Sequence, residues 1–102
     1  MAIIKLTKDN YDEIINTDKP VLIDFYADWC NPCRMLSPVI DQIAEEHDEY
    51  VIAKVDVDRE SELAIGFGVA SIPTLVVIKN GKETNRAMGV RPKSAVLALL
   101  EE

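Results

Sequence analysis

Two cysteines, separated by two residues, are the feature of this sequence with the clearest chemistry. They are the only cysteines of the chain and lie in the stretch Trp-Cys-Asn-Pro-Cys at residues 29–33. Such a pair can carry out thiol–disulfide exchange, or it can supply half of a zinc site. A tetrahedral zinc needs four ligands, and among the usual soft ligands only His47 remains. The stretch therefore predicts a dithiol/disulfide redox centre and no metal site.

A helical pattern begins directly after Cys30. Apolar residues recur at helical spacing from Pro32 to about His47, and proline suits the first turn of a helix. A helix N-terminus lowers the pKa of a nearby thiol through its free N–H groups and its dipole. We therefore predict that Cys30 is the attacking thiolate and that Cys33, one turn inside the helix, resolves the mixed disulfide. At Pro38, inside the same helix, we expect a kink.

Asp24 stands out because it lies inside the apolar run 21–27. Nearly continuous apolar residues predict a strand that is covered on both faces. A carboxylate in such a strand is costly unless it is paired, and desolvation should raise its pKa. A structural aspartate bonded to the backbone is the alternative to a functional one. Lys54 lies in the similar run 50–57 and, taken alone, would more often be a lysine whose side chain reaches the surface.

The rest of the pattern alternates strands and helices. Strands are predicted at 2–6, 21–27, 50–57, 75–79 and 83–88, with Asn80-Gly81 as the turn of a hairpin between the last two. Helices are predicted after Thr7, from Pro32, after Asp58 and from Pro92, with Thr7 and Asp58 as N-caps. The order βαβαβαββα predicts an α/β fold, in which four helices cover both faces of a mixed sheet of about five strands. At 102 residues the chain predicts one domain spanning 1–102.

The charge balance is acidic. The chain has 11 basic and 18 acidic residues, a net charge of -7, so we expect no nucleic-acid partner. Residues 1–6 lack the basic and apolar regions of a signal peptide, and no apolar run approaches the roughly 18 residues of a membrane span. We therefore expect a cytoplasmic protein without membrane contact. In that compartment a close cysteine pair is more often redox-active or metal-binding than structural. No coiled-coil pattern argues against a monomer.

Taken together and in order, the motifs resemble those of the thioredoxin family. They are the run 21–34, Pro38, the stretches 54–58 and 71–75, Asn80-Gly81 and Gly89, and the resemblance extends from end to end. Two positions depart from the family's usual pattern. Asn31 replaces the glycine of Cys-Gly-Pro-Cys, and Tyr26 stands where a second tryptophan is frequent. Neither change removes a reacting group, but both bear on redox potential and partner preference.

The resemblance implies the thioredoxin fold and a general protein-disulfide reductase without a bound cofactor. It implies that Asp24 accepts a proton near Cys33 and that Lys54 is its charge partner. It also implies a cis peptide bond before Pro73, with backbone groups presented to an extended substrate. Disulfide-containing proteins would be the substrates, and a thioredoxin reductase would be the electron donor. The resulting catalytic set is Cys30, Cys33, Asp24, Lys54 and Pro32, and the substrate surface is Trp29, Asn31, Ile72, Pro73, Met88, Gly89 and Val90.

Several alternatives stay open at the level of sequence. A positively charged residue between the cysteines would stabilise the thiolate and favour an oxidant. Asn31 is neutral, so we predict a reductant. The side chain of Asn31 either bonds a sulfur or faces solvent. Trp29 either contacts substrate or packs in the core, and we expect His47 at the surface. A glutathione-linked glutaredoxin is a second candidate, although that family usually places proline directly after the first cysteine, unlike Pro32. A third candidate is a binding module whose dithiol only regulates docking.

Overall fold

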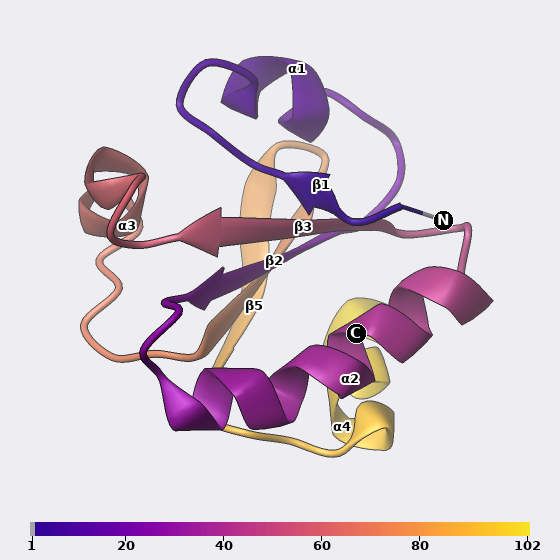
Figure 1. Cartoon of the computed structure of the whole chain (residues 1–102). Coiled ribbons are helices and arrows are strands. Elements are labelled where there is room, and N and C mark those ends of the chain that lie inside the picture. The colour runs from indigo at the N-terminus through magenta and orange to yellow at the C-terminus, as the bar shows by residue number, and fades with distance from the viewer. Residues whose placement is uncertain (1) are drawn as a thin grey trace.

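A five-stranded mixed sheet forms the centre of the computed structural model, which describes residues 2–102 (Figure 1). Its spatial order is β1-β3-β2-β4-β5. The chain follows the predicted order of strands and helices, and most boundaries fall within a few residues of the predicted ones. The strands are β1 (Ile4–Lys5), β2 (Val21–Tyr26), β3 (Val51–Asp56), β4 (Thr74–Lys79) and β5 (Lys82–Met88), and the helices are α1 (Tyr11–Ile15), α2 (Asn31–Glu46), α3 (Ser61–Gly66) and α4 (Lys93–Glu101).

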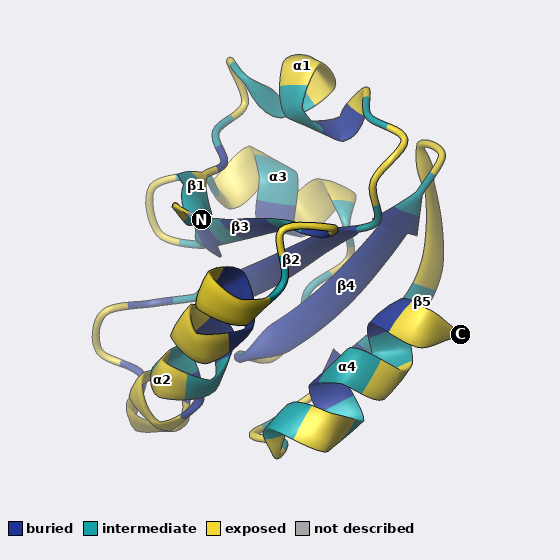
Figure 2. Ribbon diagram, turned by 90° about the vertical axis from the view of Figure 1, so that its right-hand side faces the viewer, coloured by how far each residue is buried: buried dark blue, intermediate teal, exposed yellow. Residues whose placement is uncertain are grey.

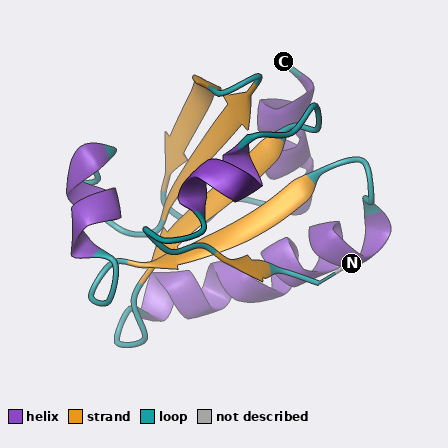
Figure 3. Ribbon diagram, turned by 90° about the horizontal axis from the view of Figure 1, so that it is seen from above, coloured by secondary structure: helices purple, strands orange, loops and turns teal. Residues whose placement is uncertain are grey.

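Strand β2 lies at the middle of the sheet, parallel to β3 and antiparallel to β4. Parallel neighbours need a long crossover connection, and α2 supplies it between β2 and β3. Strands β4 and β5 form an antiparallel hairpin, as predicted. Its turn residues Asn80 and Gly81 have positive φ angles of 54° and 80°, which Asn-Gly hairpin turns require. The strand directions change across the sheet (Figure 3), as expected of a twisted sheet.

Two helices cover each face of the sheet (Figures 1 and 2). Because side chains alternate along a strand, β2 buries neighbouring residues in two different cores. Leu22 packs with α2 and α4, whereas Ile23 and Phe25 pack on the side of α1 and α3. The first core is completed by Leu36, Ile40, Ile43, Ala44, Tyr50, Ile52, Leu75, Val77, Val96 and Leu100. The prediction of a strand covered on both faces is confirmed.

Helix α2 carries the redox stretch on its first turn. Cys30 is its N-cap residue, and Pro32 lies in the first turn as predicted. The helix continues from Asn31 to Glu46 through Pro38, and the bend expected at that proline stays a prediction. None of the helices found within residues 2–102 combines the length and the apolar character needed to span a bilayer.

The predicted cap of the third helix is wrong. Helix α3 has Glu60 as its N-cap residue, and no side chain caps it. Asp56 accounts for the difference, because its Oδ1 accepts bonds from the backbone N–H groups of Asp58 (3.0 Å) and Arg59 (3.4 Å). The resulting turn separates Asp58 from the helix. Its carboxylate instead accepts a 2.8 Å hydrogen bond from Nε1 of Trp29.

The predicted cap at Thr7 belongs to a turn that precedes the first helix. Oγ1 of Thr7 accepts a hydrogen bond from the backbone N–H of Asn10 at 3.2 Å. The backbone N–H of Thr7 in return donates to Oδ1 of Asn10 at 2.7 Å. This reciprocal pair resembles a capping box. Helix α1 itself begins only at Tyr11, with Asn10 as N-cap residue and no side-chain cap, so the predicted helix start was early.

Candidate active site at the start of helix α2

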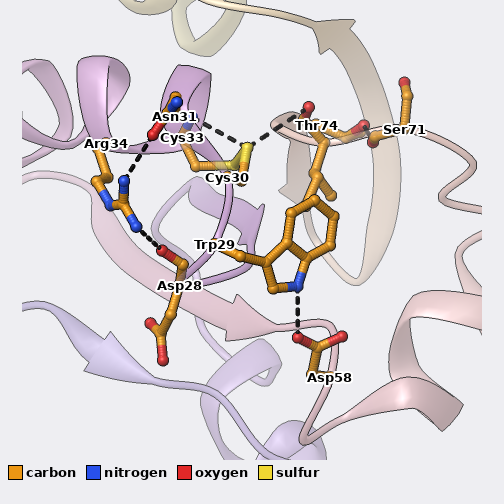
Figure 4. The surroundings of a disulfide bond; sticks show 10 residues. Asp28, Trp29, Cys30, Asn31, Cys33, Arg34, Asp58, Ser71 and Thr74 are labelled. Atoms are coloured by element: carbon orange, nitrogen blue, oxygen red, sulfur yellow. Dashed lines mark hydrogen bonds between the residues drawn. A yellow bond between two sulfur atoms is a disulfide. The ribbon is translucent and has the colours of Figure 1, made fainter.

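A disulfide between Cys30 and Cys33 lies at the N-terminus of α2 (Figure 4). The two Cα atoms are 5.3 Å apart, and each residue is only 4% exposed. Sγ of Cys30 accepts a hydrogen bond from the backbone N–H of Cys33 at 3.2 Å. In the reduced protein the same N–H group and the helix dipole favour a thiolate at Cys30 over one farther along the helix. The arrangement can therefore carry out thiol–disulfide exchange.

The segment before β4 lies against the first sulfur. The carbonyl oxygen of Ile72 is 3.9 Å from Sγ of Cys30. The peptide bond between Ile72 and Pro73 is cis, as expected. The next residues are fixed by hydrogen bonds from the Gly89 N–H to the Pro73 carbonyl (2.9 Å) and from Thr74 Oγ1 to the Ser71 carbonyl (2.6 Å). Predicted site residues from distant parts of the chain thus meet at the end of the sheet where β2 ends and β4 begins.

Large apolar side chains are exposed around the disulfide. Trp29 is 66% exposed, so it is not a core residue, and Met88 and Val90 are 59% and 43% exposed. Met35 in α2 is also exposed. Next to Trp29 lies a groove of about 180 Å³, lined by Trp29, Val57, Ala64, Val69, Ala70, Ser71 and Ile72. This apolar surface can contact another protein chain.

Asp24 is buried without a hydrogen-bond partner. It is 1% exposed, and among the described residues neither carboxylate oxygen finds a donor. The pKa of Asp24 is raised from 3.8 to about 6, mainly because burial desolvates the carboxylate. The positive charge of Lys54 lowers this pKa, and the negative charge of Asp41 raises it further. The carboxylate is therefore not held by the backbone, and it can exchange a proton near neutral pH.

Lys54 acts on Asp24 through space. The two residues are register partners on the parallel strands β2 and β3. Nζ of Lys54 nevertheless donates to Oγ of Ser37 at 3.0 Å and lies 5.3 Å from the centre of the Tyr26 ring. Within residues 2–102 it forms no ion pair with the Asp24 carboxylate. The expected charge partner is thus in the neighbouring strand, but its direct contacts are with a hydroxyl group and an aromatic ring.

Asn31 contacts a side chain that the sequence analysis did not single out. Its Oδ1 accepts a 2.6 Å hydrogen bond from Nη1 of Arg34, and Nη2 of Arg34 donates to the carbonyl oxygen of Asp28. The amide oxygen of Asn31 is therefore directed at a guanidinium rather than at a sulfur. The spacing of three residues within a helix would have been a usable signal for this pair.

A cleft of about 230 Å³ opens beside the second cysteine. It is lined by Tyr26, Ala27, Asp28, Cys33, Arg34, Ser37 and Lys54. A larger hollow of about 490 Å³ lies between α1 and the turn of the β4–β5 hairpin, lined by residues such as Asp12, Thr17 and Gly81. That hollow is at the other end of the sheet from the disulfide. The larger volume therefore does not mark the redox site. The candidate site is the smaller cleft, because Cys33 lines it.

Comparisons with known sequences agree with this geometry. The sequence profile of the family described as Thioredoxin matches residues 2–102. The chain is 43% identical to a protein named Thioredoxin from Alicyclobacillus acidocaldarius subsp. acidocaldarius, with 99% of this chain and 97% of that one covered. It is 42% identical to Thioredoxin from Mycobacterium bovis, with 99% and 89% covered.

Solved structures show the same architecture. A mutant thioredoxin from Halobacterium salinarum NRC-1 superposes with a TM-score of 0.89 at 36% identity, covering 97% of this chain and 87% of that one. Thioredoxin from Malassezia sympodialis also gives a TM-score of 0.89, at 33% identity, with 98% and 90% covered. The fold of this chain, a mixed sheet with helices on both faces as predicted, is therefore the fold of these thioredoxin structures.

Proposed function

The chain belongs to the thioredoxin family, whose members are disulfide oxidoreductases, and on that premise we propose that it is a general reductant of protein disulfides. The observation that carries the proposal is the disulfide between Cys30 and Cys33, formed on the first turn of α2. In this position the sulfur of Cys30 accepts a hydrogen bond from an N–H group of the helix terminus and lies beside the carbonyl oxygen of Ile72.

The reaction consists of two exchange steps. The thiolate of Cys30 attacks one sulfur of a substrate disulfide, and the other substrate sulfur leaves as a thiolate and takes up a proton. Cys33 then loses its proton and attacks the Cys30 sulfur of the mixed disulfide. The bond between Cys30 and Cys33 forms, and the second substrate sulfur leaves. The substrate gains two electrons and two protons, and the protein loses them.

Asp24 is the proposed acceptor of the Cys33 proton. The proposal is supported by its burial, by its unpartnered oxygens and by its pKa of about 6. A base with that pKa is mostly ionised at neutral pH and still basic enough to take a proton. Lys54, held by Ser37, would limit the rise of this pKa by its charge. Pro32 would contribute by starting the helix that positions both sulfurs.

The proposed substrate surface surrounds the Cys30 sulfur. The cis peptide unit at Ile72-Pro73 would offer main-chain groups to an extended substrate segment. The exposed side chains of Trp29, Met88 and Val90 would supply apolar contact. Gly89, with a φ of 90°, would let the backbone pass close to the substrate without a side chain in the way. Such a surface favours disulfides in flexible segments over any strict sequence.

Recycling requires an outside electron donor. We propose a thioredoxin reductase for that role, a cytoplasmic location, a place in electron transport and a monomeric state. Membership of the family supports a reductase partner and disulfide-containing substrates in general. The chain itself would work without a bound cofactor, since the two sulfurs hold the electrons that are exchanged.

Reduction of insulin disulfides with dithiothreitol as the electron source tests the proposal. The parent should turn over many times, Cys30→Ser should be inactive, and Cys33→Ser should accumulate a mixed disulfide through Cys30. No turnover by the parent, together with unchanged partner binding by Cys30→Ser, would instead support a binding module. Preference for glutathione over a thioredoxin reductase as electron donor would support a glutaredoxin-like function.

A further inference from the structure

Arg34 lies beside the disulfide, on the rim formed by the exposed side chains around it, and is held there by hydrogen bonds to two neutral acceptors. Nη1 donates to the side-chain oxygen of Asn31 at 2.6 Å, and Nη2 donates to the main-chain oxygen of Asp28. Figure 4 shows the Asp28 carboxylate turned away from the guanidinium. Neither acceptor carries a charge, so no bonded carboxylate offsets the positive charge of the guanidinium. Its remaining N–H donors are free for an incoming group.

A second cation faces the same cleft. Lys54 and Arg34 both line the cleft of about 230 Å³, whose lining also includes Cys33, Ser37 and one acidic residue, Asp28. Within residues 2–102 neither cation forms an ion pair with a carboxylate. Elsewhere on the surface such pairs are formed by Lys8, Arg59, Arg86 and Lys93. In a chain with a net charge of -7, this cleft thus brings two cations without an ion pair next to a reacting sulfur, against the single carboxylate of Asp28 in its lining.

The cleft and the Ile72 segment lie on opposite sides of the disulfide. In Figure 4, Asn31 and Arg34 are on one side of the sulfurs, and Ser71 and Thr74 are on the other. A substrate segment that brings its own disulfide to Cys30 and extends past the Ile72 carbonyl would therefore place its other flank toward the cleft. A residue next to the substrate cysteine is then the one that meets Arg34.

We propose that Asn31 and Arg34 together select protein substrates that carry an acidic side chain beside the reacting disulfide. The inference rests on the proposed reductase function and adds a substrate class to it. Arg34, assisted by Lys54, would bind the substrate carboxylate, and Asn31 is a positioning residue that acts through Arg34. A guanidinium already held in place loses less side-chain freedom on binding, so the contact is stronger than with a mobile arginine. Glycine at this position, as in the usual Cys-Gly-Pro-Cys pattern, could not hold it.

Two disulfide-bonded synthetic peptides, identical except for Asp or Asn beside one cysteine, provide the test. We measure kcat and KM for both with the full chain and a chemical electron donor. The Asp peptide should be preferred about three- to tenfold in kcat/KM at low salt, mainly through KM, and the preference should shrink in salt. Arg34→Gln should bring the ratio near one. Asn31→Gly should reduce it to about twofold, and it should have no further effect in the Arg34→Gln background.

Controls separate this inference from the proposed function. Lys82→Gln removes a positive charge at the β4–β5 turn, away from the disulfide, and should keep the ratio of the parent. Failure of the parent to reduce the Asn peptide would refute the reductase function itself. Reduction of both peptides with a ratio near one in the parent would overturn only the inference. The inference would also be overturned if Asn31→Gly left the ratio of kcat/KM between the two peptides unchanged. The same holds if Asn31→Gly lowered that ratio equally in the parent and in the Arg34→Gln background.

Discussion

Asp24 and Lys54 are register partners on adjacent parallel strands, yet the ammonium group of Lys54 bonds Ser37 and not the carboxylate of Asp24. Both oxygens of Asp24 are left without a partner among the described residues. The lysine therefore opposes the effect of burial only through its charge, and the carboxyl group titrates at about 6. Two of the following predictions depend on this titration.

Asp24→Asn should change the pH dependence of stability in the oxidised protein. The pKa of Asp24 is raised to about 6 in the folded state from 3.8, so the folded state binds the proton more tightly. The stability of the parent should therefore fall as pH rises between these two values. The free energy of unfolding of the variant, relative to the parent, should increase by about 2 kcal/mol from pH 4 to pH 7. Denaturant titrations at both pH values measure it, and a constant difference would contradict it.

The same substitution should slow the second exchange step. Without the carboxylate, Cys33 has no internal proton acceptor, so release of the reduced substrate should be about tenfold slower or more at pH 7. Below the Asp24 pKa the parent is protonated too, and the two proteins should converge. Acid-quenched single-turnover experiments follow the mixed disulfide directly. Equal resolution rates for the two proteins at pH 7 would exclude the role.

Asp58→Ala should free the indole ring of Trp29. The 2.8 Å hydrogen bond from Nε1 to Asp58 holds an otherwise exposed ring beside Cys30. We expect a lower fluorescence anisotropy of this single tryptophan and a KM for protein substrates that is raised about three- to tenfold. The free energy of unfolding should change by less than about 1 kcal/mol, because the bond lies at the surface. Asp58→Asn keeps an acceptor and should stay close to the parent in anisotropy.

Asn31→Gly should leave the reduction potential almost unchanged. The side-chain oxygen of Asn31 is bonded to Arg34 and not to a sulfur. We expect a shift of less than about 15 mV, which corresponds to roughly 0.7 kcal/mol for a two-electron couple. Equilibration with a glutathione couple measures it. A shift of about 30 mV or more would assign the side chain a redox role in place of the positioning role proposed above.

The parts of the fold that follow from local patterns could be predicted. The apolar run around Asp24 predicted a doubly covered strand, and β2 is buried on both faces. Asn80-Gly81 predicted a hairpin because few other residues accept positive φ angles at both turn positions. The cysteine spacing and Pro32 placed the disulfide at a helix start. Each of these signals acts over a few residues, so the sequence contains it directly.

Contacts between distant residues could not be predicted in the same way. Asp58 has the side chain of a helix cap, but a partner 29 residues away, Trp29, takes its carboxylate. Ser37 and Lys54 meet only because α2 packs over β3. Such contacts depend on the packing of helices against the sheet, and no local pattern specifies them. The sequence analysis missed two site residues. Ser37 contacts the distant Lys54, whereas Arg34 pairs with Asn31 on the surface of the same helix.

The contact between Cys30 and the carbonyl oxygen of Ile72 limits how the selectivity of this protein can change. A carbonyl oxygen belongs to the main chain, so no point substitution at position 72 can delete it. Mutation can therefore alter the choice of partners only through the surrounding side chains, such as those of Trp29, Asn31 and Arg34. Reactivity and selectivity are thus separable for protein engineering: the rim can be redesigned for new targets while the centre that performs the exchange stays untouched.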